Sequence, residues 1–188
     1  MRVFAALVPP LDVVEDLDAF LEVRREHGAF RWTDPEHLHL TLAFCADLPD
    51  HRLEDLVEAV GEAASRRTPV GVRLAGGGAF PHAGAAKVLW TGLSGTDEGL
   101  EEVAALARGC RSAANRVGGS PDGQAFRPHV TLARLGRPQE VSRWVRLLDA
   151  YHGPDWTADT VSVVVSHLGE GRRGRPRHEV VAEVALGG

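Results

Sequence analysis

The sequence is poor in cysteine and in long apolar runs. Of its 188 residues only two are cysteines, Cys45 and Cys110, and they lie far apart in no CxxC spacing. This pattern favours neither a zinc knuckle nor a disulfide framework. Because the N-terminus also lacks a convincing signal peptide, we expect the protein in a reducing cytoplasm. No apolar stretch approaches the roughly 20 residues that span a bilayer, so no membrane association is expected.

An excess of positive charge is also lacking. Lys and Arg total 21 against 26 Asp and Glu, a formal net charge of −5, so duplex nucleic acid is not bound through bulk charge. Lys87 is the only lysine. Because arginine favours bidentate contacts to phosphate, a local phosphate site remains compatible with this composition. An apolar content of 44% and a charged content of 25% are those of a globular protein.

Predicted helices and strands follow a similar order in the two halves of the chain. Periodicity and turn residues predict strands at 2–8, within 30–44, 70–80, 87–95, 126–135, 157–170 and 177–186, and helices at 11–28, 50–67, 96–118 and 137–151. Asp50 is the expected cap of the second helix. Thr96 and Gly99 or Asp97 are expected near the start of the third, and proline is expected in the first turn of the last. The mixture predicts an α+β fold with antiparallel sheets. We expect one domain over 1–188 with two pseudo-symmetric lobes, roughly 1–95 and 96–188, strand exchange between them being allowed.

One six-residue pattern occurs twice, ninety residues apart: HLTLAF at 39–44 and HVTLAR at 129–134. On a strand, residues two apart share a face, so His39 lies beside Thr41 and His129 beside Thr131. His37 extends the polar face of the first copy. A duplication kept for packing explains the shared leucine and alanine but not the histidine and threonine, so we interpret the pair as functional.

Two such strands facing each other across one cleft would bring two imidazoles and two hydroxyls to a ligand. Histidine, with an unperturbed pKa of about 6.5, serves as acid or base near neutrality. One histidine can deprotonate water while the other protonates a leaving alkoxide, which suits phosphodiester hydrolysis; either can be the acid. Arg134, three residues after Thr131, can place a guanidinium near the phosphate.

These residues resemble the two-histidine phosphoesterases, most closely the RNA 2′,3′-cyclic phosphodiesterases, historically called 2′-5′ RNA ligases. The resemblance rests on HLTLAF and HVTLAR and extends to RVFAALVPP, FRPHVTLAR and GRPRHEVVAEVAL, nearly the whole chain. It implies that each lobe contributes one His-x-Thr strand to a central cleft, with no metal and no cofactor. It also implies opening of a 2′,3′-cyclic phosphate to a 2′-phosphomonoester, with joining of 2′-5′ RNA ends as a possible second activity.

Carried over residue by residue, the resemblance implies that His39 and His129 are the acid–base pair. Thr41, Thr131 and Arg134 would bind the phosphate. The first motif of the family commonly ends in phenylalanine, and Phe44 stands at that position. We expect Phe44 in the core and as a substrate contact. His37 departs from the family, which more often has a small polar residue there, and we expect it beside the site without being a third catalyst. The expected partners are RNA ends or nucleotides with a cyclic phosphate, and no residue pattern signals an interface, so we expect a monomer.

Other patterns leave alternatives open. His37 and His39, with Asp34 or Glu36, have the spacing of metal ligands on a strand, but this leaves the second motif unexplained. Trp32 is equally compatible with base stacking and with the core. GEGRRG at 169–174 matches a dinucleotide-binding pattern formally, yet a strand follows it instead of a helix, so a hairpin loop with solvated arginines is expected.

The substrate also has alternatives at this stage. A small nucleotide cyclic phosphate or a 2′-5′-linked oligonucleotide would suit the same chemistry. A nucleotide-binding module without turnover is the non-enzymatic alternative. The intact histidine and threonine of both motifs argue against it, because a binder has little need of two acid–base groups.

Overall fold

The computed structural model describes residues 1–187 and has an α+β fold. Its helices are α1 (Leu11–Arg25), α2 (Leu53–Ser65), α3 (Asp97–Arg116) and α4 (Ser142–Asp149). Its strands are β1 (Arg2–Leu7), β2 (Arg31–Trp32), β3 (Leu40–Cys45), β4 (Val70–Phe80), β5 (Ala86–Gly95), β6 (His129–Gln139), β7 (Trp156–Ala158), β8 (Thr160–His167) and β9 (Arg177–Ala185). Short 3-10 helices include η1 (Pro35–His37) and η2 (Asp50–Arg52).

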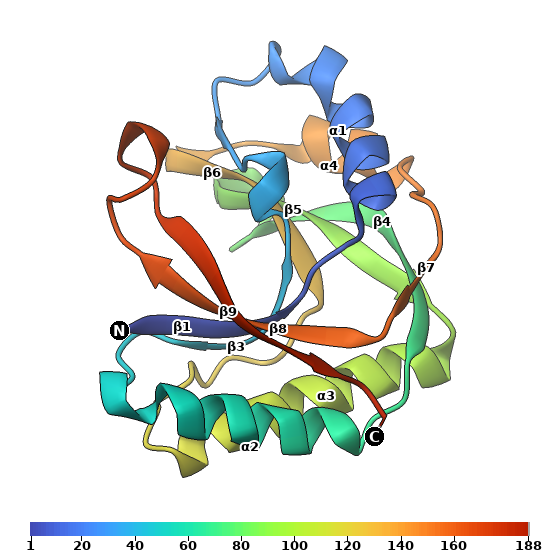
Figure 1. Cartoon of the computed structure of the whole chain (residues 1–188). Coiled ribbons are helices and arrows are strands. Elements are labelled where there is room, and N and C mark those ends of the chain that lie inside the picture. Colours follow the sequence, from blue (N-terminus) through green and yellow to red (C-terminus); the bar gives the residue numbers. More distant parts are fainter. Residues whose placement is uncertain (188) are drawn as a thin grey trace.

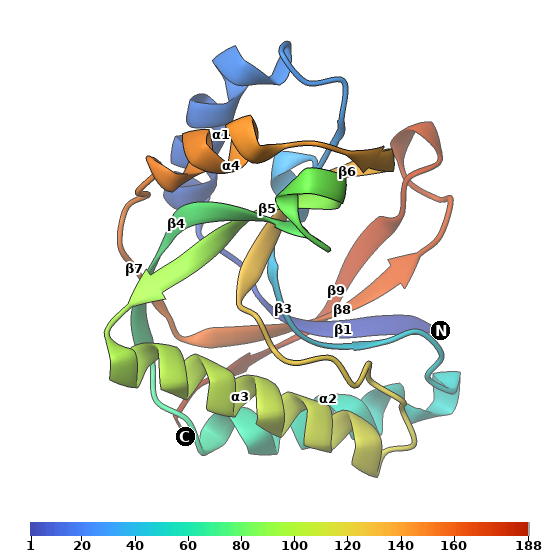
Figure 2. The same ribbon diagram turned by 180° about the vertical axis from the view of Figure 1, so that it is seen from behind.

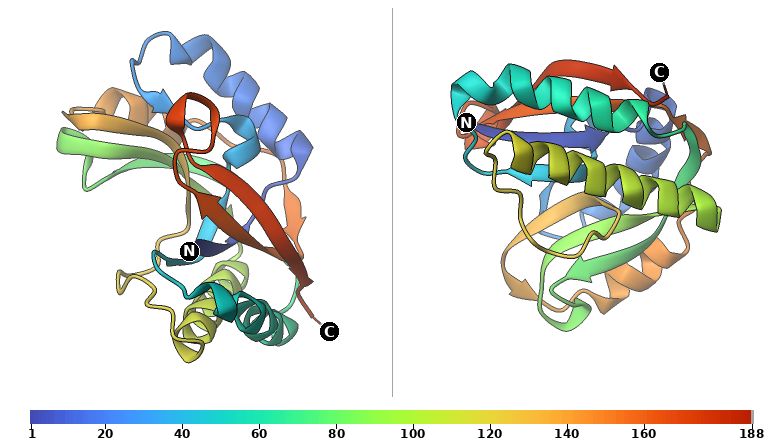
Figure 3. Two further views of the ribbon diagram at one scale, coloured as in Figure 1. Left: turned by 60° about the vertical axis from the view of Figure 1, so that its left-hand side comes forward. Right: turned by 90° about the horizontal axis from the view of Figure 1, so that it is seen from below.

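The strands form one sheet in the order β7-β4-β5-β6-β3-β1-β8-β9, with β2 paired to β6. Neighbouring strands are antiparallel, which confirms the predicted fold class. Helices α2 and α3 pack together beneath β3, β1, β8 and β9, whereas α1 and α4 lie over β4 and β5 (Figures 1 and 2). The sheet is therefore covered by helices from two opposite sides, as Figure 3 also shows.

The sheet consists of two groups of strands that meet between β3 and β6. The only Cα pair recorded between these strands within residues 1–187 is Leu40 with Val130. One group joins β1 and β3 to β8 and β9, and the other joins β4 and β5 to β6 and β7. Each group therefore combines strands from both halves of the chain, and this exchange brings the C-terminal strands β8 and β9 into the group that contains the first motif.

Alternating apolar residues of the strands and one face of each helix form the core. The apolar stripe of α2, including Leu56 and Val60, and that of α3, including Leu106, are buried against the sheet. Both cysteines are buried and free. Among residues 1–187, no helix is both long and apolar enough to cross a membrane.

Several local predictions were wrong in ways that have physical causes. The strand expected from 37 begins at Leu40, because Pro35 favours a helical turn and places His37 in η1. Asp50 is not a cap; it pairs with the N-terminal amine at 3.1 Å. Pro138 lies in β6, which extends to Gln139, so α4 begins only at Ser142. Thr96 lies at the start of α3, as expected, and caps the helix, since its hydroxyl accepts a hydrogen bond from the Gly99 amide.

Candidate active site

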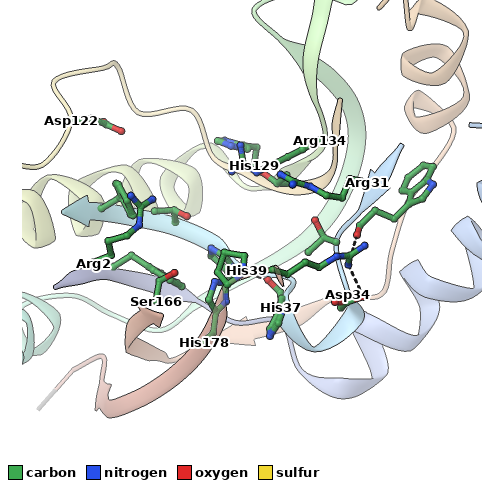
Figure 4. Close-up of a pocket in the computed structure, with 18 residues that line it drawn as sticks. Arg2, Arg31, Asp34, His37, His39, Asp122, His129, Arg134, Ser166 and His178 are labelled. Carbon is green, nitrogen blue, oxygen red and sulfur yellow. Dashed lines mark hydrogen bonds and ion pairs between the residues drawn. The ribbon is translucent and has the colours of Figure 1, made fainter. Parts of the chain in front are cut away.

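The pairing of Leu40 with Val130 sets the direction of four polar side chains. Both apolar side chains are buried, at 2% and 0% exposure, so their neighbours along each strand face the opposite side. In an antiparallel pair this register brings His39 next to Thr131 and Thr41 next to His129. All four polar residues line one cleft of about 620 Å³ (Figure 4). The two motifs thus meet as the duplication predicts.

Each motif strand has a β-bulge at the same motif position. The pairing of β3 with β1 skips Leu42, and the pairing of β6 with β5 skips Leu132. A bulge shifts the alternation of side chains by one residue. Phe44 and Arg134, which strict alternation would place on the face opposite the histidines, therefore line the same cleft. The repeated Leu-Ala of the motif is the part of the sequence at which this shift occurs.

The two motif histidines make the same backbone contact. The Nδ1 atom of His39 lies 2.7 Å from the carbonyl oxygen of His37, and that of His129 lies 2.6 Å from the carbonyl oxygen of Arg127. A carbonyl oxygen only accepts, so each Nδ1–H donates and carries the proton in the neutral ring. The Nε2 atom of each imidazole is therefore the one available for proton transfer.

Aromatic rings fix the orientation of both imidazoles. Phe4 of β1 stacks on His39 with ring centroids 4.6 Å apart and an interplanar angle of 21°. Phe80 of β4 meets His129 edge-on at 4.8 Å, and Trp90 of β5 lies at 5.9 Å. Burial lowers the pKa of both histidines, while the contacts with the backbone carbonyls raise it in part.

His178 at the start of β9 is a cleft residue that the sequence did not assign to the site. Its ring lies 4.6 Å from His37, 5.1 Å from Phe4 and 5.5 Å from His39. Burial, followed by the nearby His39 and His37, lowers its pKa to about 4. His178 is therefore neutral at physiological pH and packs as an uncharged ring against the first catalytic candidate. His37 also lines the cleft.

Among the side chains that the structure describes, four arginines line the cleft, although the whole chain is acidic. These are Arg2 of β1, Arg31 of β2, Arg134 of β6 and Arg175 before β9. Only Arg134 was predicted. Arg175, expected to be solvated, is half-buried, and its Nη1 contacts the Asp34 carboxylate at 2.9 Å and the Trp32 carbonyl oxygen at 3.0 Å (Figure 4). Burial, then Arg31 and Arg2, lower the pKa of Arg134.

The aromatic candidates Trp32 and Phe44 also line the cleft, but both make structural contacts. Trp32 packs against Phe30 and Trp144, and its indole N–H donates to the Gly28 carbonyl oxygen at 3.2 Å. The Arg2 guanidinium lies 4.9 Å above the Phe44 ring. Trp32 thus anchors the short strand β2, and Phe44 supports Arg2.

The residues considered as metal ligands do not assemble into a metal site. Asp34 is ion-paired with Arg175, and Glu36 is an exposed side chain 3.9 Å from the His37 ring. Within the described part of the chain, no three His, Cys, Asp or Glu side chains are grouped so that they could hold a metal ion.

Known proteins resemble this chain over most of its length. A family model described as the 2′-5′ RNA ligase superfamily matches residues 12–170. The RNA 2′,3′-cyclic phosphodiesterase of Thermus thermophilus is 30% identical over 175 residues, 89% of this chain and 83% of that protein. The one of Aquifex aeolicus is 26% identical over 159 residues, 84% and 82% of the two chains. A Geobacillus stearothermophilus protein of the same name is 35% identical over 103 residues, 55% of this chain but only 32% of the relative's length.

Solved structures show the same fold. TT0787 of Thermus thermophilus has a TM-score of 0.78 and 27% identity, with 100% of this chain and 99% of that chain covered. LigT of Escherichia coli has a TM-score of 0.76 and 24% identity, with 100% and 98% covered. The relatives' names agree with the family and the enzyme class that the duplicated motif predicts. The chain belongs to the 2′-5′ RNA ligase superfamily and groups with its RNA 2′,3′-cyclic phosphodiesterases.

Proposed function

We propose that this protein hydrolyses RNA ends bearing a 2′,3′-cyclic phosphate to 2′-phosphomonoesters, with His39 and His129 as the acid–base pair. The observation that carries the proposal is the Leu40–Val130 register, with two imidazoles of like tautomer and two threonine hydroxyls on one cleft face. The names of the relatives support the substrate class.

In this mechanism, the Nε2 atom of one histidine accepts a proton from water as the water oxygen attacks phosphorus. The P–O3′ bond breaks, and the Nε2–H of the other histidine protonates the departing 3′ oxygen. Thr41, Thr131 and Arg134 donate hydrogen bonds to the non-bridging oxygens, where charge accumulates in the transition state. Proton exchange with solvent restores both histidines.

The experiment is hydrolysis of an RNA oligomer ending in a 2′,3′-cyclic phosphate, with EDTA present and the product identified by ³¹P NMR. The wild type should give a 2′-phosphate, and His39→Ala and His129→Ala should each lose about 10² to 10⁴ in rate. His51→Ala, at an exposed position of η2, is the matched control and should keep wild-type activity. Absence of turnover in the wild type, dependence on a metal, or activity that survives both cleft substitutions would refute the proposal.

A further inference from the structure

Arg31 and Arg134 lie directly opposite each other on adjacent strands. They are Cα partners in the antiparallel pairing of β2 with β6, and both line the cleft. Figure 4 shows the two side chains extending close together near His129. Like charges directly opposite each other in a sheet repel, so this arrangement opposes folding unless an anion joins them.

Among the described residues, no Asp or Glu carboxylate lies close enough to offset these two charges. Within residues 1–187, neither Arg31 nor Arg134 has an Asp or Glu partner within 4.0 Å. The acid nearest in sequence to Arg31, Asp34, is instead paired with Arg175. The lowered pKa of Arg134, caused by burial and then by Arg31 and Arg2, agrees with an uncompensated cluster of positive charge.

The fold holds Arg31 in this position although β2 has only two residues. Trp32 pairs with Ala133, and its indole N–H donates to Gly28. The Thr33 amide donates to the Leu132 carbonyl oxygen at 2.8 Å. Because β2 is fixed on both sides of the pairing, the backbone of Arg31 is held opposite Arg134, so a ligand that binds both has to order only the side chains.

A 2′,3′-cyclic phosphate has a single negative charge, and the two motifs already supply its contacts. Arg134 lies three residues beyond Thr131, at most about 10 Å along β6. Arg31 of β2 is the neighbour of Arg134 on the side opposite to β5. We propose that Arg31 binds a second phosphate of the substrate, on the 5′ side of the nucleoside that has the cyclic phosphate, while Arg134 contacts the cyclic phosphate itself. This inference rests on the proposed function, and it makes the chain selective for nucleotide ends with a 5′ phosphate group over bare nucleoside cyclic phosphates.

The test compares three substrates: adenosine 2′,3′-cyclic phosphate, the same compound with a 5′-phosphate, and an adenylyl dinucleotide ending in the cyclic phosphate. The wild type should favour the second and third by about 10- to 100-fold in kcat/KM, as expected for charge-assisted hydrogen bonds. In Arg31→Gln this ratio should fall to near one, and Arg31→Lys should retain an intermediate ratio because it keeps the charge without the planar fork. The two 5′-phosphorylated substrates separate a terminal phosphate from a phosphodiester.

Arg143→Gln is the matched control, since Arg143 is an exposed residue of α4 and loses the same charge outside the cleft. It should keep the wild-type ratio. Equal wild-type efficiency on all three substrates, or an unchanged ratio in Arg31→Gln, would overturn the inference while leaving the proposed function intact.

A binding measurement separates the two claims even without turnover. By calorimetry, adenosine 2′,5′-bisphosphate should bind at least about tenfold more tightly than adenosine 2′-phosphate to the wild type, and about equally in Arg31→Gln. If this difference is found but no substrate is hydrolysed, the second-phosphate site stands and the proposed function fails. If the two ligands bind the wild type equally, the second-phosphate site is refuted.

Discussion

His39 and His129 share the environment that sets their tautomer and their proton affinity. Each Nδ1–H donates to a carbonyl two residues earlier, and each ring is packed against an aromatic side chain. Burial lowers both pKa values from the ordinary 6.5. An acid–base pair is active only when one Nε2 atom is protonated and the other is not. Activity should therefore fall both when the pH is lowered and when it is raised.

The first prediction concerns the pH dependence of kcat/KM, which should be bell-shaped with its maximum on the acid side of pH 6.5. The acid limb reports protonation of the base, and the alkaline limb reports loss of the proton from the acid. Because burial lowers both pKa values, the alkaline decline should begin below 6.5. A flat profile between about pH 5 and 9 would contradict acid–base catalysis by these histidines.

A second prediction concerns His178 and stability in acid. Its pKa is about 4 in the folded state against 6.5 for a free imidazole, so the unfolded chain takes up this proton first as the pH falls. Folding stability from His178 is therefore complete above 6.5 and is lost between 6.5 and about 4. Urea unfolding at pH 7 and 4.5 should give a loss in the wild type about 2 kcal/mol larger than in His178→Asn. His51→Asn is the surface control, and equal losses in wild type and His178→Asn would contradict the burial of a neutral ring.

At the scale of elements, two glycines of β4 allow neighbouring side chains to pack directly against the backbone of the strand. A Cβ on Gly78 would overlap the Trp90 indole, and one on Gly77 would overlap Leu148 of α4. Trp90 is the ring that lies beside His129. Gly78 thus helps determine where the second imidazole is held, although it makes no contact with a substrate.

A third prediction follows from this packing. Gly78→Ala should destabilise the fold by about 1–3 kcal/mol, because the indole must move, and it should lower kcat by displacing the support of His129. Gly71→Ala, in the same strand with nothing within 4 Å of the added Cβ, should be neutral or slightly stabilising. Thermal unfolding and single-turnover rates of both variants provide the measurement. Equal behaviour of the two would show that the Trp90 contact has no such role.

The sequence predicted the motif residues but not most of the residues around them. His39, Thr41, His129 and Thr131 could be identified because alternation within one strand places each pair on one face. Arg134 was proposed from its position three residues after Thr131, whereas Phe44 was proposed as a substrate contact from the resemblance. Alternation alone would have placed neither in the cleft, because it does not reveal the bulges that turn both side chains into it.

The missed residues come from other strands: Arg2 from β1, Arg31 from β2, His178 from β9 and Arg175 from the loop before it. Their proximity depends on long-range strand pairing, which no local pattern encodes. The alternation of 177–186 predicted a strand, but it did not predict which strands or side chains would lie beside it.

At the scale of the whole molecule, a chain of net charge −5 has arginines along the cleft that contains both motif histidines. The acidic residues lie elsewhere or are paired, so attraction of an anionic substrate is local. The lobes are tied across the cleft by the Leu40–Val130 pair and by the ion pair of Arg175 with Asp34. The strands that carry the cleft arginines are therefore held together across the cleft.

A fourth prediction concerns salt. Salt screens contacts between exposed charges, so kcat/KM for a dinucleotide with two bound phosphates should fall more steeply with salt than kcat/KM for a nucleoside cyclic phosphate. Equal slopes for both substrates would contradict the extended basic cleft.

The measurement that tests the central claim most directly uses a cyclic phosphate whose bridging 3′ oxygen is replaced by sulfur. A thiolate leaves without protonation, so only the histidine that acts as acid becomes dispensable. The account predicts that one of His39→Ala and His129→Ala recovers to near the wild-type rate on the sulfur substrate, whereas the other stays about 10² to 10⁴ slower. Recovery of both variants, or of neither, would contradict an acid–base pair with one proton donor and one acceptor.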